Sequence, residues 1–211
     1  MTNPSRPHTL GRFARAGFQD LSGARDALDA LAEKVDQPSG DLIDAFACAA
    51  DPDMALARIS AIAASSPAPR RSLGEREWQH LTLLVGASSA LGHFFERHPD
   101  RLARVLASGG RVIAEDEARE TLMASVGAVA TGPGGVSVAA SGGESSWNAL
   151  RIAYRELLAE LMLHDLARGL DGEATGAFDA VSASLSDLAA ATLDAALAIA
   201  RAALIAGDSG P

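Results

Sequence analysis

The chain has 211 residues, of which 48% are hydrophobic and 4% aromatic, and its formal net charge is −9. This length suffices for one sizeable core or two small ones, and an apolar content dominated by Ala and Leu favours closely packed helices over a sheet. The acidic balance offers no overall electrostatic attraction to nucleic acid or anionic lipid. We therefore predict an all-α protein, either a multi-helix bundle or a solenoid-like array of helix pairs, with no significant sheet.

The N-terminal end is expected to be poorly ordered. Pro4 and Pro7 disfavour helix there, so we expect residues 1–20 to form a flexible arm. Helices are then predicted over residues 22–34, 41–50 and 51–65, where apolar residues recur at helical spacing. Asp51-Pro52-Asp53 is typical of a helix start, because an acidic cap precedes proline at the first helical position.

The next apolar pattern runs from Glu75 to Arg97, with small residues at 86–89, where we expect a break or kink. His98-Pro99-Asp100 should end this helix and begin another over 101–107, because proline suits a first helical turn. The same tripeptide occurs in J-domain co-chaperones, but the preceding helix is not basic, which favours helix punctuation. With a further helix expected over 116–129, residues 21–130 form a predicted N-terminal helical region.

Residues 131–146 are rich in glycine and serine. We expect them to form a mobile surface loop that proteases cut first. A phosphate-binding interpretation fails, because no strand is expected before the loop and no Lys-Ser/Thr pair follows at the required spacing. Residues 207–211 are interpreted as a tail or the start of a linker.

Residues 147–206 form a predicted long-helix region that completes the bundle, with helices over 147–169 and 178–206. In the first, Glu156 and Glu160 are expected on the solvated side. Asp165 interrupts the apolar stripe, where an unpaired charge is costly, so we predict that it is at least partly buried and paired. Its candidate partners are Arg97, Arg101 and Arg104. The stripe itself consists of Leu150, Tyr154, Leu157, Leu158, Leu161, Met162 and Leu166.

Groups for catalysis or metal binding are sparse. His93 and His98 are five residues apart and His164 is adjacent to Asp165, so no histidine pair has metal-ligand spacing. Asp165 as a catalytic acid or base has no second convergent polar group, which favours a structural ion pair. The single cysteine, Cys48, excludes an internal disulfide and fits a reducing cytosol, so we expect a cytoplasmic protein.

A membrane span is also disfavoured. The longest Ala- and Leu-rich run, residues 188–206, is interrupted by Asp194 and Arg201. We therefore expect neither membrane nor nucleic acid among the partners.

Three segments, in order, carry a family resemblance: A-D-P-D-M-A-L-A-R-I at 50–59, L-L-V-G-A-S-S-A-L-G-H-F-F-E-R-H-P-D at 83–100 and L-R-I-A-Y-R-E-L-L-A-E-L-M-L-H-D-L-A at 150–167. L-A-A-A-T-L-D-A-A-L-A-I-A-R-A follows at 188–202. Together they resemble the N-terminal helical part of the bacterial, most closely actinobacterial, bifunctional glutamine synthetase adenylyltransferase/deadenylylase family.

The resemblance implies a place in a nucleotidyltransferase that attaches AMP from ATP to a tyrosine of glutamine synthetase and removes it by phosphorolysis. In that family Mg²⁺ is held by carboxylates of a Ser-Asp-x-Asp strand motif, which this chain lacks. No catalytic, cofactor-binding or metal residue is therefore carried onto the chain, and alone it is expected to be inactive. Mg²⁺ and ATP are implied for the full-length enzyme only.

The implied role of the segment is positioning or docking. Its implied partners are glutamine synthetase and the enzyme's own downstream nucleotidyltransferase domains. The alternative is a stand-alone helical protein-interaction domain without enzymatic activity.

Overall fold

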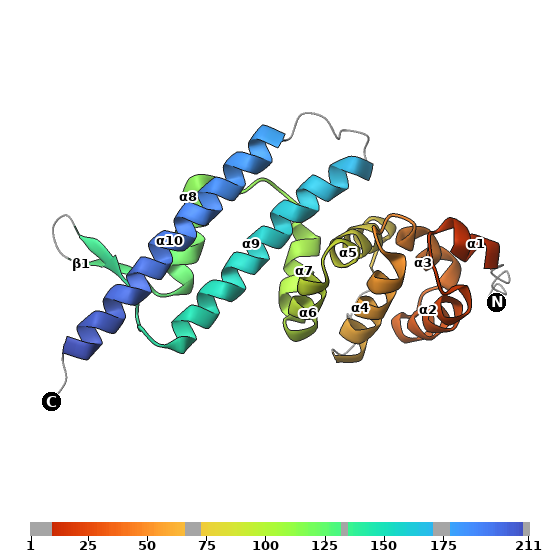
Figure 1. Ribbon diagram of the computed structural model, residues 1–211, viewed down its shortest axis with the longest axis horizontal. Coiled ribbons are helices and arrows are strands. Elements are labelled where there is room, and N and C mark those ends of the chain that lie inside the picture. The colour runs from red at the N-terminus through yellow and green to blue at the C-terminus, as the bar shows by residue number, and fades with distance from the viewer. Residues whose placement is uncertain (1–9, 66–72, 132–134, 171–177, 209–211) are drawn as a thin grey trace. The chain divides into compact units, whose positions relative to one another are not determined.

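A computed structural model describes residues 10–65, 73–131, 135–170 and 178–208. Within these ranges the chain forms ten helices and one two-stranded antiparallel hairpin (Figure 1). The predicted all-α class is confirmed, and the sheet is confined to two strands of three residues each.

The chain divides into two compact units. Unit 1 contains the described residues up to Gly110 together with the part of the ninth helix from Met162. Unit 2 contains Arg111–Leu161 and the last helix. The long ninth helix thus supplies residues to both units. The boundaries between the two units therefore differ from those of the regions expected over 21–130 and 147–206.

Unit 1 is a succession of short helices in which the pairs α1 and α2, α3 and α5, and α4 and α6 are in contact. Its centre is aromatic: Phe13, Phe46, Phe94 and Phe95 are each 0% exposed. Phe18 joins two of them, with ring centroids 5.5 Å from Phe13 and 5.8 Å from Phe46. The helices are α1 (Leu10–Arg15), α2 (Leu21–Val35), α3 (Ser39–Phe46), α4 (Pro52–Ser65), α5 (Glu75–Ala87), α6 (Ser89–Arg97) and α7 (Pro99–Ser108).

These aromatic contacts correct the expected flexible arm. Residues 1–9 lie outside the described residues, but α1 begins at Leu10 and its Phe13 is fully buried. Phe18, three residues before Leu21, is 5% exposed. The expectation for 1–20 was therefore wrong from residue 10 onward, because two phenylalanines anchor this stretch in the unit 1 core.

The predicted helix punctuation is confirmed at two places. α5 ends at Ala87, and the Ser88 hydroxyl accepts a hydrogen bond from the Leu91 N–H at 3.3 Å, which starts α6. α6 ends before His98, and α7 begins with Pro99 as its first residue. A serine cap and a proline at a first helical position thus explain both boundaries.

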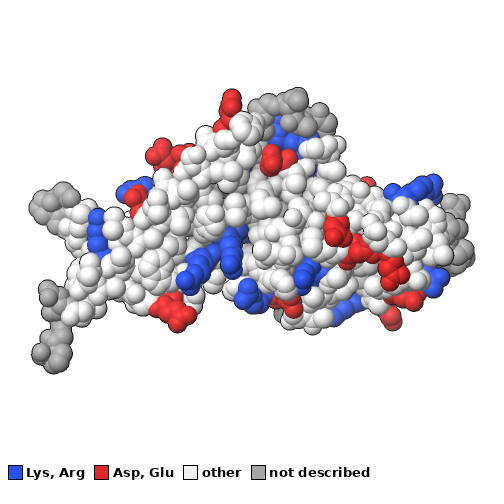
Figure 2. All heavy atoms as spheres, viewed as in Figure 1, with Lys and Arg blue, Asp and Glu red and all other residues white. Residues whose placement is uncertain are grey.

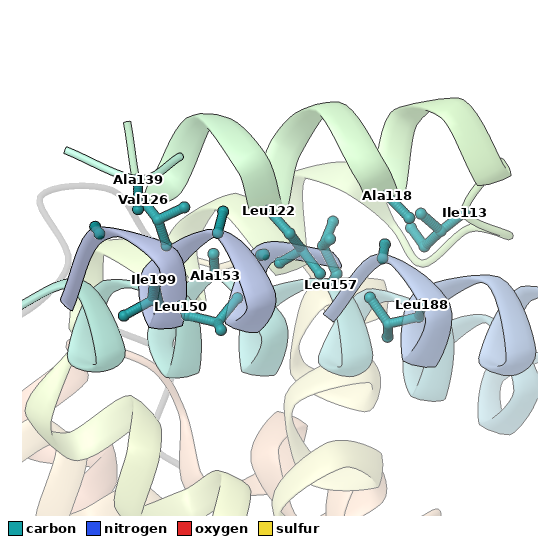
Figure 3. Close-up of a cluster of buried hydrophobic side chains, with 14 of the residues drawn as sticks. Ile113, Ala118, Leu122, Val126, Ala139, Leu150, Ala153, Leu157, Leu188 and Ile199 are labelled. Carbon is teal, nitrogen blue, oxygen red and sulfur yellow. The ribbon is translucent and has the colours of Figure 1, made fainter. Parts of the chain in front are cut away.

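Unit 2 packs α8 (Glu115–Ser125) and α10 (Phe178–Asp208) with the first part of α9 (Glu144–Leu170). Figure 3 shows side chains from all three helices meeting in one cluster. α10 contributes mainly small residues to it, namely Leu188, Ala191, Ala195, Ala198, Ile199 and Ala202. Alanines at these positions allow the helices to approach closely.

The loop predicted over 131–146 is also corrected. β1 (Val129–Thr131) and β2 (Val136–Val138) form an antiparallel hairpin in which Val129 pairs with Val138. The Ala139 N–H then donates to the Ala198 carbonyl of α10 at 3.1 Å, and α9 begins at Glu144. Residues 132–134 lie outside the described residues, but the remainder of the segment is ordered and docked by backbone hydrogen bonds and close packing.

Glycine makes that docking possible. A Cβ on Gly142 would lie 2.3 Å from the Cα of Ala203 in α10, closer than any side chain tolerates. Gly142, one of the glycines that suggested mobility, therefore serves close backbone approach.

Candidate functional site

Asp165, the acid singled out from the sequence, is exposed on α9, and its side chain forms no ion pair or hydrogen bond with the described residues. Its expected partners bond elsewhere: Arg101 and Arg104 contact Asp100 at 3.3 and 3.5 Å, and the Nε of Arg97 donates to the His93 carbonyl. The prediction that Asp165 is buried and paired was wrong, because the buried face of this part of α9 carries Leu163 and Ala167.

The buried acid of α9 is instead Glu160, which is 7% exposed although it was expected on the solvated side. Arg111 reaches it from the segment before α8, with Nε 2.6 Å from the Glu160 Oε2. The same guanidinium binds Glu117 through two contacts of 2.7 Å each. The Arg111 N–H also donates to the Glu160 backbone carbonyl at 3.2 Å, so main chain and side chain both tie this segment to α9.

The electrostatics of this cluster are those of a buried ion pair. Burial raises the pKa of the Glu160 carboxyl, and the Arg111 guanidinium opposes that rise. Hydrogen bonding to Glu117 in turn raises the pKa of Arg111. One cation thus lies between two carboxylates, and its side-chain contacts are made within the cluster. We therefore interpret the Arg111–Glu117–Glu160 cluster as a structural clasp, which means that it holds the segment before α8 against α9.

A second clasp lies beside it. The Ser184 hydroxyl of α10, 1% exposed, accepts from the Ile113 N–H at 3.0 Å and donates to the Ile113 carbonyl at 2.8 Å. Both backbone groups would otherwise be buried without a partner in the segment that leads into α8. The sequence did not predict roles for Arg111 and Ser184. Arg111 pairs with Glu160 about fifty residues away, and Ser184 bonds Ile113 about seventy residues away, so no local sequence pattern indicates either contact.

Unit 1 contains a surface pocket of about 270 Å³ lined by Gln37, Asp41, Asp44, Ala45, Leu73, Glu75 and Trp78. Asp44 at its rim is paired with Arg12 at 2.8 Å. The Gln37 amide is held by the Leu73 carbonyl at 2.8 Å. The described lining residues combine three carboxylates with a largely buried indole, and they do not include a nucleophile with an adjacent base.

The histidines and the cysteine do not assemble a reactive group in the described part of the chain. His93 contacts Arg58 at 3.3 Å and Glu96 at 3.7 Å, whereas the His98 ring packs against Phe94 with centroids 5.0 Å apart. Among the described residues, no group of three or more His, Cys, Asp or Glu side chains has a geometry that could hold a metal ion. Burial raises the pKa of the Cys48 thiol, which disfavours the reactive thiolate.

The most distinctive surface belongs to α10. Leu188 and Ile199 lie in the core, but several of its other large side chains point away from it: Leu193 is 71% and Leu204 is 74% exposed. We call Leu185, Leu193, Leu197 and Leu204, which lie on one side of the helix, the exposed leucine row. In Figure 2, uncharged atoms predominate along α10.

α10 is also the one helix among the described residues that is long and apolar enough to cross a membrane by length and composition alone. The candidate span is Phe178–Gly207, and a third of its most apolar part is buried inside the protein, where α10 packs against α8 and α9. Asp194, on its flank, is paired with Arg119 of α8 at 2.9 Å. The expectation that membranes are not a partner remains a prediction.

Comparison with known proteins connects this helical chain to one group of bacterial enzymes. It is 39% identical over 206 residues to the bifunctional glutamine synthetase adenylyltransferase/adenylyl-removing enzyme of Leifsonia xyli subsp. xyli, with 96% of this chain and 19% of the relative covered. The proteins of the same name from Bifidobacterium longum and Streptomyces coelicolor are 33% and 31% identical, over 89% and 96% of this chain. No protein-family model and no solved structure matches.

The matched segment is a small part of these relatives. The chain spans about a fifth of their length, and the match lies at their N-terminal end. Over about nine-tenths of its length, the chain is thus a homologue of the N-terminal segment of the actinobacterial bifunctional glutamine synthetase adenylyltransferase/adenylyl-removing enzymes.

Proposed function

We propose that this chain acts as the leading helical segment of a glutamine synthetase adenylyltransferase/adenylyl-removing enzyme and positions or docks the catalytic parts. The observation that carries the proposal is the match, over nearly the whole chain, to only the N-terminal fifth of enzymes with that name. Glutamine synthetase and the enzyme's own nucleotidyltransferase domains are its proposed partners, and the cytoplasm is its proposed location.

The geometry supports a role other than chemistry. Phosphoryl transfer requires metal-held phosphates and groups that stabilise developing charge. In support of this proposal, the charged cluster of Arg111 with Glu117 and Glu160 is occupied by its own ion pairs. We therefore assign no step of the reaction to this chain.

An assay of AMP transfer tests the proposal. We expect the isolated chain, incubated with Mg²⁺, ATP or phosphate, and unmodified or adenylylated glutamine synthetase, to neither attach nor release labelled AMP. A fusion in which this chain precedes the part of the Leifsonia xyli enzyme that follows the matched segment should do so. Turnover by the chain alone, after removal of host enzyme, would refute the non-catalytic role.

The positioning role needs a second comparison. The Leifsonia xyli remainder without any leading segment should modify glutamine synthetase more slowly than the fusion. Equal rates would show that the segment does not position anything, and would favour the second candidate, a stand-alone helical interaction domain, for which the exposed leucine row of α10 is the supporting observation.

A further inference from the structure

The exposed leucine row of α10 is larger than packing within unit 2 explains. Leu185, Leu193, Leu197 and Leu204 are 43%, 71%, 48% and 74% exposed, while the opposite side of the same helix is filled with buried alanines. Soluble proteins seldom leave contiguous apolar surface of this kind without a binding partner. Apart from Leu188 and Ile199, α10 turns mainly alanines inward and leaves most of its larger side chains outward, whereas a surface helix usually buries its larger apolar residues.

The flanks of the row determine what kind of surface covers it. Asp194 is paired with Arg119, and Arg201 donates to the Ser137 carbonyl at 3.2 Å, so charged groups border the row on one side. An apolar centre with a charged, already satisfied border is typical of a protein interface, in which polar groups remain at the rim. A membrane-spanning helix would instead be apolar on all sides, whereas α10 carries the charged groups of Asp194 and Arg201.

The relatives supply the occupant. About four-fifths of each relative lies outside the matched segment and, since the match is N-terminal, it follows the part that corresponds to α10. In these relatives a large part of the protein thus follows the helix that corresponds to α10. Because that part is covalently linked, its local concentration at this helix is high without any second molecule.

We propose that the exposed leucine row is the surface onto which this following part of the enzyme packs, through a complementary apolar patch. The inference rests on the proposed function, since it names the partner of the positioning segment. α10 then has two packed sides, with alanines toward α8 and α9 and leucines toward the remainder of the enzyme.

Cysteine labelling provides a direct test. In a Cys48→Ser background, Leu193→Cys and Leu204→Cys place single thiols on the row. Val129→Cys, at a 64% exposed position of β1 in the same unit, is the matched control. Maleimide labelling rates are compared between the chain alone and its fusion to the Leifsonia xyli remainder. In the fusion, the labelling rates of the thiols at 193 and 204 should fall by about tenfold or more, while the labelling rate of the thiol at 129 should stay unchanged.

Other results would overturn the inference. Unchanged rates at positions 193 and 204 in the fusion would show that the row is not covered by the remainder. Slower labelling of the chain alone as its concentration rises would assign the row to a second copy. Slower labelling of the fusion only upon addition of phosphatidylcholine–phosphatidylglycerol vesicles would assign it to a membrane.

The AMP assay of the same fusion separates the two proposals. An active fusion with fully reactive thiols at 193 and 204 would refute the docking surface and leave the proposed function standing. An inactive fusion with protected thiols would support the surface and count against the function.

Discussion

Replacing Arg111 should destabilise unit 2 in a way that depends on pH. Arg111→Met keeps most of the aliphatic stem but leaves Glu160, whose side chain is 9% exposed, without its cation. Breaking a buried pair from one side typically costs roughly 3–5 kcal/mol. Because the Arg111 side chain is 38% exposed and partly screened by water, we expect a smaller loss of about 2–3 kcal/mol at pH 8.

The sign of the pH dependence follows from the Glu160 pKa. Burial already raises it in the folded protein, and loss of Arg111 removes the effect that opposes the rise. A carboxyl with a raised folded pKa binds more protons in the folded state, so its penalty is fully present above that pKa and is relieved as the pH falls toward the unfolded value of about 4.3. The difference between Arg111→Met and the unmodified protein should therefore shrink between pH 8 and pH 5.

The assay is urea unfolding followed by fluorescence of Trp147 of α9, a unit 2 residue, in a Trp78→Phe background. Arg119→Met is the matched control: its pair with Asp194 is exposed on both sides, so its loss should cost no more than about 1 kcal/mol.

The double variant Arg111→Met/Glu160→Gln should regain most of the stability at pH 8, because the buried charge is gone. If the urea midpoint of Arg111→Met equals that of Arg119→Met, the structural clasp is refuted. If Arg111→Met lowers the unfolding free energy by the same amount at pH 5 and pH 8, its electrostatic basis is refuted.

Three further changes test the remaining structure. Ser184→Ala should lower the free energy of unfolding of unit 2 by roughly 1–3 kcal/mol, because the buried N–H and carbonyl of Ile113 lose their partners; an unchanged urea midpoint would contradict the clasp. Gly142→Val should force the hairpin segment off Ala203 of α10, and limited proteolysis should then cut the variant faster than the unmodified chain within residues 135–143. Asp165→Ala should shift the unfolding free energy by less than about 0.5 kcal/mol, since this side chain is exposed, and a larger loss would restore the discarded ion pair.

The positions of most helices follow from local sequence signals. Asp51 before Pro52, Ser88 after a run of small residues and Pro99 after His98 each determine a helix end through backbone geometry and capping within a few residues. Such signals do not require knowledge of the rest of the fold, so the all-α class and the order of helices could be predicted. The family resemblance likewise depends on short ordered segments and was confirmed by the relatives.

The sequence alone does not determine which face of a long helix is buried. In α9, leucines occur on several sides, so the pattern pointed to Asp165 as the interrupting acid, whereas the fold buries Glu160. Its partner Arg111 comes from a segment that approaches α9 through Gly110, at a positive φ of 82° and with no space for a Cβ. A contact between residues so far apart in sequence leaves no periodic trace in either segment.

α10 shows the same limit most clearly. Hydrophobicity predicts that leucines are buried before alanines, yet close helix packing in unit 2 admits the alanines and turns Leu193 and Leu204 outward. Composition and periodicity thus established an Ala-rich helix and its length. Only the tertiary structure decided which of its faces forms the core and which is left for a partner, because that choice depends on the separation between neighbouring helices and not on the helix itself.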